Sequence, residues 1–173
     1  MRRLSFFLLL FFQCAVSQTS FEKTWATYYN DGFCFIQSST IDKDGNVYMV
    51  GSVKQNSVFS TTINAFQSSY GGGNTDGFIT KFSPNGSVVW ATFFGGNGDE
   101  IIKGVVIDSQ NNVYLIGLTS SSSSIATLNS FRSTIPGSTS SFITKFNSEG
   151  DLGWSTYYTA GGSDITLIGE MGN

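Results

Sequence analysis

Short runs of apolar and aromatic residues, separated by turn-forming residues, make up most of the chain. Between residues 101 and 158 these runs read IIKGVVID, NVYLIGLT, SFITKF and GWSTYY. Their lengths and their content of Val, Ile, Tyr, Phe and Thr are typical of β-strands. The joints DKDGN, SQNNV, SPNGS and NSEGD carry Gly or Asn, the residues that tolerate the positive φ of tight hairpin turns. The pattern predicts short antiparallel strands joined by hairpins.

The same runs recur along the chain with a period of about 65 residues. The recurring blocks are WATYY, WATFF and WSTYY, which start at Trp25, Trp90 and Trp154; NVYMVG and NVYLIG; AFQS and SFRS; and FITKF, which occurs twice unchanged. Their order never changes, so the chain contains a tandem duplication. We expect a repeat region over residues 18–173, with units starting at about 25, 90 and 154 and the last one incomplete.

Both faces of the expected sheets are apolar. In WATYY the side chains of Trp25 and Tyr29 share one face, and Ala26 and Tyr28 lie on the other. Four-stranded antiparallel units that need burial on both faces and repeat in tandem suit the blades of a β-propeller. We therefore predict an all-β fold, an incomplete β-propeller with about two four-stranded blades plus partial ones. A β-sandwich would explain the short strands but not the period.

The motifs DKDGNVYMVG and NAFQSSYGGGNTDGFITKFSPNGSVVWATFFGGNGDE resemble the bacterial SBBP repeat, a β-propeller repeat of secreted and surface proteins. The resemblance covers about residues 24 to 164. It implies a propeller architecture and no common catalytic residues. A closed propeller typically has four to eight blades, and this chain ends inside a repeat. We therefore expect a truncated member, with self-association through open blade edges as the alternative.

The N-terminal sequence MRRLSFFLLLFFQCAVSQ has the features of a secretory signal peptide. Two arginines precede a short apolar run, and the small residues Ala15 and Ser17 follow it. We predict a signal peptide over residues 1–17, cut after Ser17, and hence a secreted, cell-surface or periplasmic protein. The apolar run is about half the length of a membrane span. Lipidation at Cys14 is a further alternative.

The composition excludes some classes of protein. Charged residues make up 12% of the chain and aromatic residues 15%, with a formal net charge of −3. A disordered or nucleic-acid-binding chain would be less apolar or strongly basic. After removal of the signal peptide, Cys34 has no cysteine partner in the chain. We expect it to be a small buried apolar residue, with a reactive thiol or an intermolecular disulfide as alternatives.

The chain carries no recognisable catalytic constellation. It contains no histidine, which removes the commonest general base and the Ser-His-Asp arrangement. DKDGN begins like a calcium-binding loop, but its glycine comes too early, at the fourth position instead of the sixth. We expect no cofactor and no metal ion. Aspartates of the turns are expected to accept hydrogen bonds from their own backbone; they are Asp42, Asp44, Asp108 and Asp151.

The glycine-rich segments YGGGNTDG and FFGGNGDE are the best candidates for a binding site. They lack the lysine of a phosphate-binding P-loop. In an up-and-down blade both segments emerge at the same end of the sheet, and DKDGN and SPNGS emerge at the other. The candidate ligand-binding residues on this loop face are Asp76, Asp99, Glu100 and Asp164. Alternatively, these side chains only cap turns between blades.

Two functions are compatible with these patterns. The first is a non-enzymatic secreted or surface scaffold, an adhesion-type module that binds protein or polysaccharide at the loop face. The second is a fragment of a propeller enzyme that acts on polysaccharide through carboxylates, or a truncated product without independent function. We expect neither nucleic-acid binding nor a membrane span.

Overall fold

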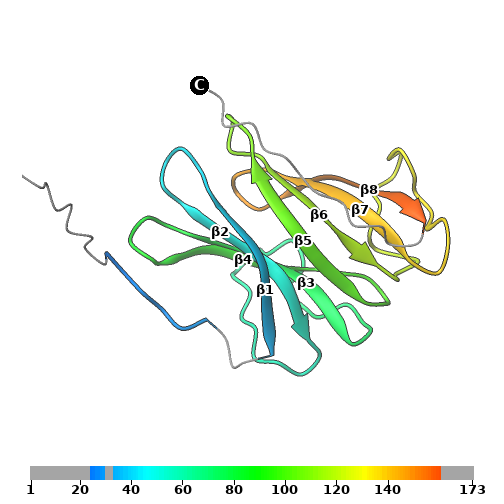
Figure 1. Cartoon of the computed structure of the whole chain (residues 1–173), viewed down its shortest axis with the longest axis horizontal. Helices are drawn as coiled ribbons and strands as arrows, with labels where there is room; N and C mark the ends of the chain where they lie inside the picture. Colours follow the sequence, from blue (N-terminus) through cyan, green and yellow to red (C-terminus); the bar gives the residue numbers. More distant parts are fainter. Residues whose placement is uncertain (1–23, 30–32, 161–173) are drawn as a thin grey trace, which may run out of the picture.

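The computed structural model describes residues 24–29 and 33–160. Residues 34–160 contain two four-stranded antiparallel sheets that lie side by side (Figure 1). The first sheet, blade 1, consists of β1 (Cys34–Ile41), β2 (Val47–Lys54), β3 (Thr75–Phe82) and β4 (Val88–Phe94). The second sheet, blade 2, consists of β5 (Glu100–Ile107), β6 (Val113–Thr119), β7 (Ser140–Phe146) and β8 (Leu152–Ala160). In each sheet the strands lie in chain order. The predicted all-β architecture with two four-stranded blades is confirmed.

The hairpin turns adopt the positive-φ backbone conformation that their Gly and Asn residues predict. Gly45 and Asn111 occupy equivalent positions in the β1–β2 and β5–β6 turns, with φ of 81° and 62°. Gly86 and Gly150 do the same in the β3–β4 and β7–β8 turns, with φ of 84° and 91°. Asn can replace Gly at the first position because it tolerates the left-handed region better than most residues.

The aspartate that opens each β1–β2-type turn binds the turn backbone. The Asp108 carboxylate accepts hydrogen bonds from the backbone N–H groups of Gln110 (2.9 Å) and Asn112 (2.8 Å). In the first blade the Asp42 carboxylate accepts equivalent bonds from Asp44 and Asn46. The structural role expected of these two turn aspartates is therefore confirmed.

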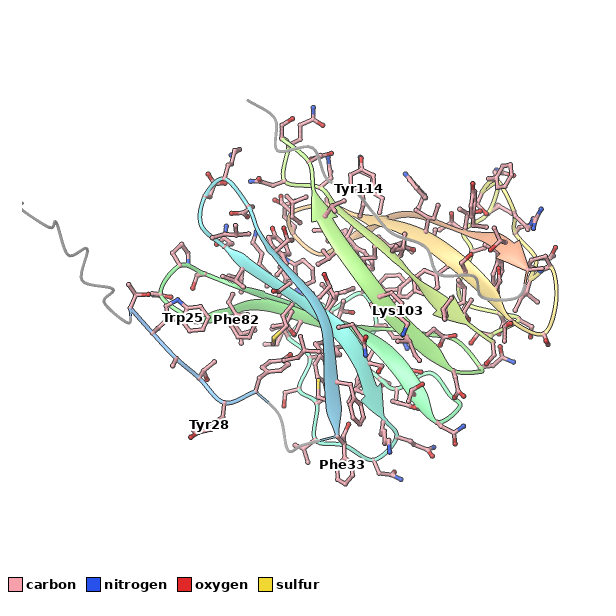
Figure 2. All side chains as sticks on the ribbon, in the orientation of Figure 1. Trp25, Tyr28, Phe33, Phe82, Lys103 and Tyr114 are labelled. Atoms are coloured by element: carbon pink, nitrogen blue, oxygen red, sulfur yellow. The ribbon has the colours of Figure 1, made fainter. Side chains whose placement is uncertain are left out.

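A bulge in the first strand of each blade explains the glycine that ends NVYMVG and NVYLIG. The register of β1 against β2 shifts between Ile36 and Ser38, and the register of β5 against β6 shifts at the equivalent place, around Lys103 (Figure 2). A Cβ on Gly51 would lie 1.9 Å from the carbonyl oxygen of Phe35. Only glycine allows the bulged strand to come this close.

The outer edge of each blade is covered by the long loop between its second and third strands. In blade 1 the Thr62 N–H donates to the Ala91 carbonyl (3.1 Å), and the Phe93 N–H donates to the Gln67 carbonyl (3.1 Å). The loop thus takes up hydrogen-bonding groups of β4 that an edge strand would leave open.

In blade 2 the equivalent loop covers the outer strand, β8, in the same way. The Thr127 N–H donates to the Ser155 carbonyl (2.9 Å), and the Tyr157 N–H donates to the Arg132 carbonyl (3.1 Å). The repeated AFQS and SFRS blocks lie in these loops. The outer edges of the two described blades are therefore partly covered by their own loops, and self-association through open blade edges stays a prediction.

The first WATYY block does not form the outer-type strand that the repeat predicts. Residues 24–29 contain no strand. A strand needs a neighbouring strand to form its hydrogen-bond ladder, and the described residues offer none beside this block. Trp25 still stacks on Phe82, with ring centroids 6.0 Å apart, while Tyr28 points away from the sheet and is fully exposed (Figure 2). The aromatic packing of this block is kept without its hydrogen-bond ladder.

The main hydrophobic core lies between the two blades. It contains Tyr48, Val50, Ile79, Trp90 and Phe94 from blade 1 and the following residues of blade 2: Ile102, Val105, Val113, Leu115, Ile125, Phe142, Phe146 and Tyr157. A smaller cluster of Val53, Phe78 and Phe93 covers the other face of blade 1, and the half-buried Cys34 packs against it. Cys34 thus contributes to apolar packing, as expected.

Two of the sequence predictions concern residues that the structure does not describe. The predicted signal peptide, residues 1–17, and the last part of the repeat region from residue 161 lie beyond the described residues. In the described part of the chain, no helix has the length and apolar character needed to cross a membrane.

Replacing Gly51 with Ala should destabilise the protein, because the new methyl group would overlap the Phe35 carbonyl. We expect the free energy of unfolding to fall by about 2–3 kcal/mol, measured by urea denaturation. Gly137→Ala is the matched control, since a Cβ there would meet its nearest atom at 3.7 Å. Equal stability of the two variants would contradict the close approach at the β1 bulge.

Candidate functional site

The two glycine-rich loops meet at one end of the blades, as the up-and-down topology predicts. A Cβ on Gly71 would lie 2.7 Å from the carbonyl oxygen of Gly96, and a Cβ on Gly73 would lie 2.4 Å from that of Gly98. The loops therefore pack backbone against backbone across the joint between blades. Their glycines are needed for this close approach, because a side chain at Gly71 or Gly73 would overlap the opposite backbone.

Asp76 lies beneath these loops at the start of β3 and is fully buried. One of its carboxylate oxygens accepts hydrogen bonds from the Gly71 N–H (2.6 Å) and from Nε2 of Gln67 (3.4 Å). The other oxygen, Oδ1, has no hydrogen-bond partner among the described residues. Burial raises the pKa of Asp76 from 3.8 to about 6, because desolvation disfavours the charged carboxylate.

Glu100 is also fully buried, at the start of β5. Its carboxylate accepts hydrogen bonds from the Gly96 N–H (2.8 Å) and from the hydroxyls of Ser121 (2.6 Å) and Thr119. Burial raises the pKa of Glu100, and these hydrogen bonds oppose the shift. A Cβ on Gly95 would meet the Asp76 Oδ1 at 2.6 Å and the Glu100 Oε2 at 2.7 Å, so the two carboxyl groups are close neighbours.

Asp99 has a different environment at the rim of the same joint. Its carboxylate accepts hydrogen bonds from the N–H groups of Asn74 and Thr75, the latter at 3.3 Å, and from the Asn74 side chain. The Asn74 backbone hydrogen bond is the main cause that lowers the pKa of Asp99. Asp99 therefore stays ionised and ties the start of blade 2 to the β2–β3 loop of blade 1. Asp164, the fourth predicted residue, lies outside the described residues.

The stretch that joins the blades also carries the likeness to a known repeat. Residues 89–123 match the SBBP beta-propeller repeat. The matched range runs from β4 through the glycine-rich crossing to β5, and ends just after β6. No curated protein is matched by the chain.

Asp99 and Glu100 lie within the matched range, and the structure places them at the crossing between two blades. Three of the four predicted site residues come together there, but only Asp99 reaches the surface. The buried carboxylates of Asp76 and Glu100 instead accept hydrogen bonds from the loop N–H groups of Gly71 and of the buried Gly96. Among the described residues, no group of three His, Cys, Asp or Glu side chains is arranged to hold a metal ion.

Sequence reasoning missed the part played by Gln67. Its Oε1 accepts a hydrogen bond from the Gly95 N–H (2.9 Å), and its Nε2 donates to the Ser69 carbonyl (3.0 Å) and to Asp76. Gln67 thereby links the edge-covering loop, the crossing and the buried carboxylate. The recurrence of AFQS as SFRS marked this position, but the glutamine side chain is replaced by Arg132 in the second copy.

Three hollows on the described surface have room for a ligand, and one of them, of about 450 Å³, lies beside Trp90 and the β7–β8 turn. A shallow groove of about 350 Å³ beside the loop face is lined in part by Phe66, Gln67, Asn97 and Ser123. A larger and more apolar hollow of about 560 Å³ lies on the outer side of blade 2, over Trp154 and its neighbours. The repeat pattern predicted the region beside the loop face and not the other two.

The pH dependence of stability tests the burial of Asp76. Because its pKa is higher in the folded than in the unfolded protein, its contribution is greatest below pH 3.8 and is lost as pH rises to about 6. The Asp76→Asn variant should not show this loss. The difference in free energy of unfolding, variant minus original protein, should therefore rise by about 1–3 kcal/mol between pH 4 and pH 7. Urea denaturation at both pH values measures this.

Asp108→Asn provides the control of opposite sign. Burial raises the pKa of Asp108, but its hydrogen bonds outweigh burial and leave the pKa below the usual range. This variant should therefore lose stability relative to the original protein as pH rises from 3 to 7. Parallel pH profiles for Asp76→Asn and the original protein would show that Asp76 does not hold its proton in the fold.

Proposed function

We propose that this chain is a non-enzymatic, exported β-propeller repeat protein that acts as a scaffold or adhesion-type binding module. The observation that carries the proposal is the use of the loop-face carboxylates. Asp76 and Glu100 are buried and accept hydrogen bonds from the glycine-rich loops, and Asp99 holds the N–H groups of Asn74 and Thr75. These acids stabilise the joint between blades and do not present a pair of carboxyl groups to a substrate.

The groove beside the loop face supports a binding role. Its lining combines the half-exposed Phe66 ring with polar groups of Gln67, Asn97 and Ser123. An aromatic face beside amide and hydroxyl groups suits a sugar or a short peptide, since the ring covers apolar C–H surface and the polar groups exchange hydrogen bonds. Polysaccharide and protein are therefore both retained as ligand classes.

One observation favours the alternative of a carboxylate enzyme. The pKa of Asp76 is raised by burial while the pKa of neighbouring Asp99 is lowered by hydrogen bonds. Opposite shifts in neighbouring acids are typical of acid and base pairs in enzymes. Against this, the Asp76 carboxyl is enclosed beneath the loops, where Gly71 and Gly95 lie against it. The scaffold function is therefore the better supported of the two.

A combined binding and hydrolysis assay separates these functions. The purified protein is screened on a glycan array and incubated with the same glycans to detect cleavage. We expect no cleavage by the original protein or by Asp99→Asn, because Asp99 serves the joint between blades. Cleavage that Asp99→Asn or Asp164→Asn abolishes would overturn the proposal in favour of the enzyme.

Export is tested by the N-terminus of the protein made in a host with a secretory pathway. If residues 1–17 are a signal peptide, mass spectrometry of the exported protein should show a chain that begins at Gln18. Ala15→Arg and Ser17→Arg should block this cut, because the cleavage site requires small residues. A chain that keeps Met1 and stays inside the cell would contradict export.

A further inference from the structure

A pair of aromatic residues four positions apart occurs three times in equivalent strand-like blocks. The pairs are Trp25 and Tyr29, Trp90 and Phe94, and Trp154 and Tyr158. Residues four apart in an extended chain point to the same side. Each pair therefore presents one aromatic surface, and the structure shows where that surface goes in the first two cases.

The second pair inserts into the following blade. The Trp90 ring lies against Gly150, whose Cβ would be 2.9 Å from it, and the indole N–H donates to the Ser148 carbonyl (3.0 Å). The ring centroids of Phe94 and Phe142 are 5.1 Å apart. The outer strand of blade 1 thus packs on a surface of blade 2 that consists of the β7–β8 turn and the face of β7 that carries Phe142. This surface, and its equivalent on blade 1, is called the seat.

The first pair makes the same contacts one repeat earlier. The Trp25 ring lies against Gly86, whose Cβ would be 2.8 Å from it. The Tyr29 ring centroid lies 5.9 Å from that of Phe78 and 5.5 Å from that of Phe82. Gly86 and Phe78 are the blade 1 equivalents of Gly150 and Phe142. Residues 24–29 therefore fill on blade 1 the seat that β4 fills on blade 2 (Figure 2).

The third pair is partly exposed to solvent. Trp154 is 38% exposed where Trp90 is 7% exposed, and Tyr158 is 46% exposed where Phe94 is fully buried. Both line the apolar hollow of about 560 Å³ on the outer side of blade 2. Its other apolar lining residues are Leu128, Phe131 and Ile143. This surface is the repeat equivalent of the blade 1 surface that blade 2 covers.

A lysine beside the pair completes the equivalence. In blade 1 the Lys81 ammonium lies 5.2 Å from the centroid of the Tyr48 ring and donates to the Ser148 carbonyl at 3.1 Å. In blade 2 Lys145 lies 5.3 Å from the centroid of the Tyr114 ring. Lys145 and the Trp154 indole are thus placed to donate to a turn carbonyl of a further blade.

We propose that this face of blade 2 binds blade 1 of a second copy of the chain. Trp154 and Tyr158 of one copy would take the places that Trp25 and Tyr29 hold on blade 1 of its partner. Blade 1 fits because its turn offers the Pro84 carbonyl and Gly86 where blade 2 offers the Ser148 carbonyl and Gly150. Residues 24–29 can leave the seat because they form no strand ladder with blade 1.

This contact joins two different surfaces, so it can propagate from copy to copy and close into a ring. The described residues of each copy form two blades, and two to four such pairs of blades would give four to eight blades, the range of closed propellers. The assembly uses the apolar face of a blade and not its outer edge, which the Thr127 to Arg132 loop covers. It does not depend on any ligand at the loop face.

Opposite effects of two tryptophan variants test the proposal. Light scattering of the purified full-length protein over roughly a hundredfold range of concentration should show a concentration-dependent oligomer. Trp154→Ala should raise the dissociation constant at least about tenfold, as expected for a central interface tryptophan. Trp25→Ala should lower it, because it weakens the segment that competes for the seat on blade 1.

Two further variants keep the result interpretable. Phe131→Ala, on the neighbouring loop and 77% exposed, should also weaken the oligomer without removing core contacts. Tyr28→Ala, in the competing segment but fully exposed, should leave it unchanged. Circular dichroism and thermal unfolding confirm that each variant is folded.

Three results would overturn the proposal. A folded protein that stays monomeric throughout the range excludes it, as expected if further blades of a longer polypeptide cover this face. An oligomer that neither Trp154→Ala nor Phe131→Ala weakens must use another surface. Weakening by both Trp154→Ala and Trp25→Ala would show that residues 24–29 support the assembly and do not compete with it.

Discussion

The structure depends on the packing of one blade against the face of the next. A four-stranded sheet with two apolar faces cannot bury either face by itself, and the main core accordingly lies between blades 1 and 2. The outer strand of blade 1 contributes Trp90 and Phe94 to this core, and the turn of blade 2 contributes the backbone surface at Gly150. A tryptophan can lie there only because the turn residue has no side chain. The same requirement acts at Gly86, where Trp25 takes the place of an outer strand.

Close packing of the faces also determines the chemistry of the loop end. The glycine-rich loops approach until their backbones touch, which buries N–H groups that need acceptors. Asp76 and Glu100 supply those acceptors from below, and the resulting desolvation raises the pKa of both carboxyl groups. Asp99, at the rim, accepts similar hydrogen bonds with less burial, and its pKa falls. Packing at the joint between the blades is therefore enough to explain why neighbouring carboxyl groups have pKa shifts of opposite sign.

Much of the fold follows from local sequence pattern. Strand lengths, hairpin turns, the turn aspartates Asp42 and Asp108 and the common end of the two glycine-rich loops all depend on residues close together in the chain, or on the alternation of an up-and-down sheet. The burial of Asp76 could not be predicted in this way, because it depends on how closely the β2–β3 loop at Gly71 and the crossing at Gly95 approach. The cover of β4 and β8 was also missed, because the recurrence of AFQS as SFRS shows that the block matters but not which strand it contacts.

The sequence by itself determined the repeat, the four-stranded unit and the residues of each turn, because hydrophobic periodicity and turn chemistry are local properties. Tertiary structure decided which surfaces of those units are used. The aromatic pairs of WATYY, WATFF and WSTYY are nearly alike in sequence, yet one lies on blade 1 without a strand, one is buried between blades and one is exposed. Their burial depends on the neighbour that each pair meets. A local pattern does not contain that neighbour.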